Sequence, residues 1–76
     1  MANFIQVTVY QDLNEKAVAG LPRQISVAKC FQFVPDTSVP TAVTRIEMLY
    51  NKDNQLKSGS LYVSETAAAL TTAANA

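Results

Sequence analysis

The chain has 76 residues and balances six lysines and arginines against six aspartates and glutamates. This length suits one domain, spanning residues 1–76, and leaves no room for a second. The even charge disfavours a nucleic-acid binder, because such proteins need a net basic surface to neutralise phosphates. Cys30 is the only cysteine and histidine is absent, which excludes an intrachain disulfide and a zinc site of Cys and His ligands.

Hydrophobic residues make up 49% of the chain and charged residues 16%. The chain is therefore too apolar to be disordered, and it has few charges for the surface of a free monomer. In a domain this small the free energy of burial barely exceeds the entropy lost on folding, so a further support is common. With disulfide and zinc excluded, we expect that support to come from copies of the chain or from a larger assembly.

The first predicted element is a strand over residues 4–10. Ile5, Val7 and Val9 alternate with residues that point to the opposite face, and this period of two in β-branched and aromatic residues is typical of a strand. The next residues, 11–23, are polar or small and include a glycine and a proline near their end. We expect a long hairpin loop there, and the alternative is a short helical turn.

A second strand is predicted over residues 24–34, ending before Pro35. Lys29 interrupts its apolar face, which indicates a bend or bulge at that point. Cys30 falls on the opposite face. The residues expected to share the apolar face are Ile25, Val27, Phe31 and Phe33.

The third strand is predicted over residues 41–50, where apolar side chains again alternate. Residues 51–54 read Asn-Lys-Asp-Asn, and Asn and Asp favour tight turns because they tolerate left-handed backbone conformations. A return strand follows over 55–63, with an irregularity at its Ser-Gly pair. The pattern predicts a hairpin with one uneven arm.

A short helix is predicted at the end of the chain, over Ala67 to Ala74. Ser64 is the expected cap, and Glu65 would benefit from the positive end of the helix dipole. Leu70 is the only large apolar residue of the segment, so the helix needs a surface to pack on. The predicted fold class is mainly β (α+β): a small antiparallel sheet of about four strands with a short C-terminal helix.

No residue pattern predicts catalysis, a metal site or a cofactor. Cys30 is expected to be a small packing residue within a strand. The carboxylates are scattered and show no metal-ligand spacing, and the two glycines are too isolated to form a phosphate-binding loop. We therefore expect no enzymatic activity, no catalytic residues and no cofactor.

Large apolar residues fall on both faces of several predicted strands, which suggests a sheet whose second face is covered by a neighbouring molecule. The aromatic residues could instead form a base-stacking platform, but few cations lie among them. The interface candidates are Phe4, Tyr10, Phe31, Phe33, Leu49, Tyr62 and Leu70.

The sequence thus predicts a non-catalytic structural protein that self-associates or docks on a larger complex. A virion component of a phage, such as a minor capsid, decoration or connector protein, is the concrete form of this expectation. The alternative is a small β-sheet module that binds nucleic acid or a peptide. We expect the chain in the cytoplasm or in a virion, because it shows neither a secretion signal nor an apolar run long enough to cross a bilayer.

Overall fold

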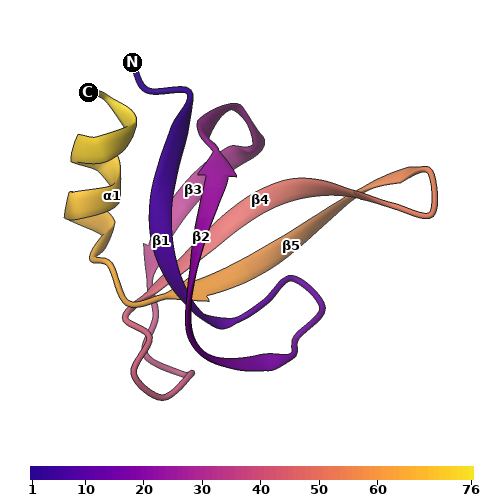
Figure 1. Cartoon of the computed structure of the whole chain (residues 1–76), viewed down its shortest axis with the longest axis horizontal. Coiled ribbons are helices and arrows are strands. Elements are labelled where there is room, and N and C mark those ends of the chain that lie inside the picture. Colours follow the sequence, from indigo (N-terminus) through magenta and orange to yellow (C-terminus); the bar gives the residue numbers. More distant parts are fainter.

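A computed structural model describes residues 1–76 as a curled five-stranded antiparallel sheet with one helix (Figure 1). The strand order is β2-β1-β5-β4-β3, and a short 3-10 turn, η1, joins β2 to β3. The mainly β fold with a C-terminal helix is confirmed, with five strands in place of about four. The elements are β1 (Phe4–Gln11), β2 (Ala17–Ser26), η1 (Val27–Lys29), β3 (Cys30–Pro35), β4 (Thr44–Lys52), β5 (Gln55–Val63) and α1 (Ala67–Ala74).

The predicted long loop after β1 is in fact a short hairpin loop followed by a strand. The Asp12 carboxylate accepts hydrogen bonds from the backbone N–H groups of Asn14 and Lys16, both at 2.9 Å. Glu15 takes a left-handed conformation with φ 62°. These features close the loop within a few residues, in the manner of a type I turn followed by a left-handed residue, so β2 begins at Ala17.

Pro22 lies in the middle of β2, although proline cannot donate a hydrogen bond to a sheet. Its partner across the ladder is Thr8 of β1. The backbone groups of Thr8 are used on the other side, where its N–H bonds Glu65 and its C=O bonds Ser64. The missing N–H of Pro22 therefore faces the open edge of the sheet, the position where an edge strand tolerates proline.

The predicted strand over 24–34 is broken by η1, which carries the chain from one edge of the sheet to the other. Cys30 lies close enough to the end of β2 for its thiol to donate to the Ser26 carbonyl, at 3.3 Å. The two edge strands therefore converge here and the sheet curls around its core. The expected bend near Lys29 is confirmed, but the chain leaves the strand altogether instead of bulging within it.

A bulge within β3 changes which face its side chains occupy. Cys30 pairs with Met48 and Gln32 pairs with Glu47, so Phe31 has no partner on β4. Directly paired residues share a face of a sheet. Cys30 consequently faces the core together with Phe33, whereas Phe31 is 58% exposed. The predictions that Phe31 shares a face with Phe33 and that Cys30 lies on the opposite face are both wrong because of this extra residue.

Strands β4 and β5 continue beyond the rest of the sheet as a two-stranded ribbon, residues 49–58, which we call the arm (Figure 1). β3 pairs with β4 only as far as Met48, and β1 meets β5 only near Val63. The arm ends in the predicted turn, where Asp53 and Asn54 both have positive φ. Two such residues form the type I′ turn that suits a twisted hairpin.

The core lies between the curled strands and α1. Leu70 and Ala74 are the buried residues of the helix, which contacts β1 and β3. The helix bounds are as predicted, but its cap is Thr66, whose hydroxyl accepts from the Ala69 N–H at 3.1 Å. Ser64 does not cap the helix, because α1 begins only at Ala67, three residues later; its N–H instead donates to the Thr8 carbonyl of β1. The core contains Ile5, Val7, Val9, Ile25, Ile46, Met48, Leu61, Val63, Leu70 and Ala74.

The one buried polar residue, Thr44, leads to a first prediction. Its side chain is fully buried, and its hydroxyl has no hydrogen-bond partner. Thr44→Val keeps the branched shape and removes an unpaired polar group, so it is expected to raise the free energy of unfolding by about 1–2 kcal/mol. Urea unfolding followed by circular dichroism measures the change.

Thr8→Val is the matched control for this substitution. It makes the same chemical change where the hydroxyl is bonded, to Glu65 at 3.0 Å, so it is expected to lower stability by about 1 kcal/mol. Equal effects of the two substitutions would show that the Thr44 hydroxyl is satisfied in solution.

Candidate functional site

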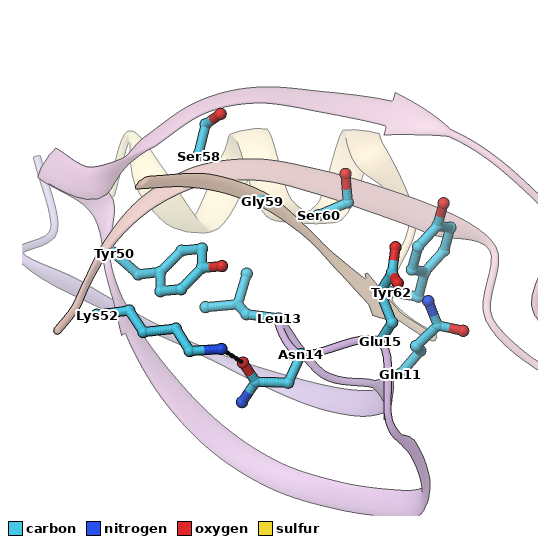
Figure 2. Close-up of a pocket in the computed structure, with 10 residues that line it drawn as sticks. All are labelled: Gln11, Leu13, Asn14, Glu15, Tyr50, Lys52, Ser58, Gly59, Ser60 and Tyr62. Carbon is cyan, nitrogen blue, oxygen red and sulfur yellow. Dashed lines mark hydrogen bonds between the residues drawn. The ribbon is translucent and has the colours of Figure 1, made fainter. Parts of the chain in front are cut away.

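A polar hollow of about 440 Å³ separates the β1–β2 loop from the base of the arm (Figure 2). Tyr50 and Lys52 come from the arm, and Leu13 and Asn14 come from the loop. The Lys52 ammonium contacts the Asn14 side-chain oxygen across the gap, at 3.5 Å. The other lining residues are Gln11, Glu15, Ser58, Gly59, Ser60 and Tyr62.

The apolar side chains at this hollow serve to attach the arm to the loop. A Cβ atom on Gly59 would lie 2.8 Å from the Tyr50 ring and 3.4 Å from Leu13. The absence of a side chain at Gly59 thus lets Tyr50 and Leu13 pack directly on the β5 backbone. Because Leu13 already covers this edge of β5, we interpret the hollow as the junction between loop and arm.

Most carboxylates are engaged in structural contacts. On the outer face of the sheet, Arg45 pairs with Asp36 at 3.1 Å and with Glu47 at 2.6 Å. Glu47 also accepts from the Ser60 hydroxyl at 3.0 Å. Hydrogen bonds from the Ser38 side chain and backbone, followed by the charge of Arg45, lower the pKa of Asp36. The sequence offered no sign of this network, because its members come from three separate segments.

The chain's possible metal ligands and reactive groups are its cysteine and its carboxylates. No group of three or more His, Cys, Asp or Glu residues is placed to hold a metal ion. The Cys30 thiol donates to a backbone carbonyl, and its burial raises its pKa, which reduces the fraction of reactive thiolate. Cys30 also packs against the core, as expected for a packing residue.

An apolar surface covers the end of the molecule where the N-terminus meets η1. One hollow of about 500 Å³ is lined by Met1, Phe4, Val27 and Ala28, among others. A second hollow of about 320 Å³, between β3 and α1, shares Val27 and includes Phe31. We call Met1, Phe4, Val27, Ala28 and Phe31 the apolar end. Phe4 is 61% exposed and Phe31 58%, so both rings are open to a partner.

The predicted interface candidates are dispersed in the structure. Phe4 and Phe31 lie in the apolar end, and Leu49 lies on the arm. Leu70 is 1% exposed and belongs to the core, so it presents no surface to a partner. The remaining candidates are partly buried at separate places: Tyr10, Phe33 and Tyr62.

Sequence reasoning missed Leu56, which is 63% exposed on the arm, and the contribution of Val27 and Ala28. On the second face of the sheet, Arg45 and Glu47 of β4 form an ion pair. Alternation along a strand predicts which face of the sheet a residue lies on. It does not predict which residues of different strands lie close together at the apolar end.

No helix of the structure is both long enough and apolar enough to cross a membrane. Comparison with known protein families, curated proteins and solved structures gives no match for this chain.

Proposed function

We propose that the chain is a non-catalytic structural protein that acts by associating with copies of itself or with a larger protein assembly. The apolar end carries this proposal. Two aromatic rings more than half exposed, in two hollows that share Val27, are unusual for a free monomer and typical of the centre of an interface.

The expected strength of association follows from the exposed area. Phe4 and Phe31 each expose about three fifths of their surface, on the order of 120 Å² apiece. Covering both rings contributes about 6 kcal/mol, which is near the lower end of the cost of association. A single contact through the apolar end is therefore expected to be weak and to depend on concentration.

Weak contacts between individual copies are sufficient to stabilise an assembly in which many copies are held together. A virion component of a phage, such as a minor capsid, decoration or connector protein, is the concrete form of our proposal. What supports it is the combination of small size, zero net charge and a confined apolar surface.

The alternative of a nucleic-acid or peptide module has less support. Tyr50, which borders the polar hollow, packs on the β5 backbone at Gly59. Its ring is thus partly used within the chain and does not form a free stacking platform. We therefore favour assembly over this alternative.

Sedimentation velocity from micromolar to millimolar concentration tests the proposal. We expect the wild-type sedimentation coefficient to rise with concentration, and the variant carrying Phe4→Ser and Phe31→Ser to remain monomeric. Gln24→Ser is the control, because Gln24 is exposed on β2 outside the apolar end. A wild-type chain that stays monomeric at millimolar concentration overturns self-association.

A further inference from the structure

The N-terminal hairpin, formed by β1 and β2, is joined to the rest of the chain by η1 alone (Figure 1). β2 and β3 are the two edge strands of the sheet, so η1 connects opposite edges within three residues. The hairpin packs on the other three strands and α1, which together we call the body. The hairpin supplies four of the ten core residues: Ile5, Val7, Val9 and Ile25.

Few contacts within η1 hold this turn closed. Ser26 and Cys30, which flank it, already have extended backbone conformations, with φ −76° and ψ 124° at Ser26 and φ −91° and ψ 130° at Cys30. The Ser26 side chain does not cap the turn, and no residue of η1 is buried. The Cys30 thiol donates to the Ser26 carbonyl across the turn, at 3.3 Å. Only Val27–Lys29 must therefore change conformation to make β2 and β3 one continuous strand.

The local sequence favours that extended form. Residues 24–34 predict a single strand and contain neither glycine nor proline. Val27 is β-branched, so it suits a strand better than a helical turn. Its N–H already continues the β1–β2 ladder by donating to the Asn3 carbonyl at 3.0 Å. The turn is thus imposed by the packing of the hairpin on the body, and a short hinge of this kind favours exchange of an element between copies.

We propose that the β1–β2 hairpin swaps between two copies of the chain, with η1 as the hinge. When Val27–Lys29 is extended, β2 carries its hairpin away from β3, and the hairpin packs on the body of the second copy. Each contact between hairpin and body is then made between chains, on a surface that the hairpin already covers in this structure. This inference goes beyond the proposed association through the apolar end, because the swapped contact does not depend on the exposed rings of Phe4 and Phe31.

A swapped dimer differs from a surface contact in how it forms. The hairpin must leave its own core before it can exchange, so native monomers and swapped dimers interconvert only through an opened state. We expect swapped dimers when the chain is refolded from urea at millimolar concentration, and we expect them to persist after dilution. A contact through the apolar end forms without unfolding and is lost on dilution.

A disulfide between hairpin and body tests the swap directly. Gln11 of β1 pairs with Tyr62 of β5, and directly paired residues lie close enough for a disulfide. In the variant Gln11→Cys, Tyr62→Cys and Cys30→Ser, this disulfide lies within one chain of a closed monomer and joins two chains of a swapped dimer. We expect the refolded, oxidised dimer to run at twice the chain mass on a non-reducing denaturing gel. Variants that carry only one of the two new cysteines are the controls and should give no such dimer for the hairpin–body pair, and circular dichroism checks that each variant folds.

Substitutions at the hinge provide a second test. Ser26→Asp adds a side-chain cap, which stabilises a turn about fivefold. A swapped dimer opens two hinges, so we expect this substitution to lower the dimerisation constant about 25-fold. Lys29→Val favours the extended form and removes like charges from the two neighbouring hinges, so it is expected to raise the constant. Lys57→Val makes the same change at an exposed position of the arm and is expected to leave the constant unchanged.

The outcomes distinguish this inference from the proposed function. Refolded dimers whose disulfides all lie within single chains overturn the swap, and so does a refolded chain that is wholly monomeric. Hinge variants that fail to shift the dimerisation constant in opposite directions also overturn it. None of these results decides association through the apolar end, which is measured by sedimentation of the chain that has never been unfolded.

Discussion

Replacing Leu70 with alanine is expected to lower the free energy of unfolding by about 3–5 kcal/mol. Leu70 is 1% exposed, and it is the only large apolar residue of α1. A domain of 76 residues has a total stability of about 4–11 kcal/mol. The Leu70 side chain alone thus accounts for a large share of the free energy of unfolding of the whole chain.

The size of this effect comes from how α1 is held. Eight residues are too few for a stable helix in water, so α1 persists because Leu70 and Ala74 pack against β1 and β3. Leu70→Ala leaves a cavity and also weakens the only large anchor of the helix. We expect amide hydrogen exchange to show early loss of protection over Ala67–Ala74, before the sheet opens.

Thr72→Ala is the control, since it removes exposed atoms from the same helix and is expected to change stability by less than about 0.5 kcal/mol. Leu70→Met keeps the volume and is expected to cost less than about 1.5 kcal/mol. If urea unfolding shows that Leu70→Ala costs no more than Leu70→Met, the helix does not depend on this anchor.

The helix and most of the sheet could be predicted from local pattern. The alternation of Ile5, Val7 and Val9 identified β1, the Asp-Asn turn identified the tip of the arm, and the alanine run gave the bounds of α1. Each of these signals lies within a few consecutive residues, where propensity and periodicity act.

The parts that could not be predicted depend on contacts between distant segments. Gly20 and Pro22 suggested a loop, yet Pro22 is tolerated because the backbone of Thr8 is bonded on its far side. Phe31 was assigned to the apolar face of a strand, and one bulge residue moved it to the surface. A shift of one residue reverses every following side chain, and nothing local in the sequence fixes that register.

The apolar end could not be predicted from the sequence for the same reason. Phe4 and Phe31 were recognised as candidates, but they lie 27 positions apart in the sequence. They line two hollows that share Val27, because η1 connects the two edge strands of the sheet beside the N-terminus. The candidate surface is thus a product of the curl of the sheet.

Glu65→Ala is expected to lower the free energy of unfolding by about 2–3 kcal/mol. The Glu65 carboxylate accepts from the Thr8 backbone N–H at 2.8 Å and from the Thr8 hydroxyl at 3.0 Å. Ser64 bonds the Thr8 carbonyl at 3.1 Å. These contacts lie where β1 and β5 separate. The Glu65 side chain and the Ser64 backbone make the hydrogen bonds to Thr8 that a neighbouring strand would otherwise make.

The effect is large because the alanine variant leaves a partly buried backbone donor without its acceptor. Glu65→Gln retains an oxygen for the Thr8 N–H and an amide that can donate to the hydroxyl, so it is expected to cost only about 1 kcal/mol. The double variant Glu65→Ala with Thr8→Val completes a cycle whose coupling energy reports the hydroxyl–carboxylate bond.

We call the contacts of Ser64 and Glu65 with Thr8 the clamp. The clamp matters because the curled sheet has few other links between its two halves. β1 pairs with β5 over only a few residues near Val9 and Val63, so the β1–β2 hairpin is held to the other three strands by this short ladder, the clamp and the core. Urea unfolding of the three variants should rank them Glu65→Gln, Thr8→Val and Glu65→Ala, with the first two similar and the last distinctly the least stable. A Glu65→Ala variant as stable as Glu65→Gln would mean that water replaces the carboxylate at Thr8, and that the short ladder and the core suffice to join the two halves of the sheet.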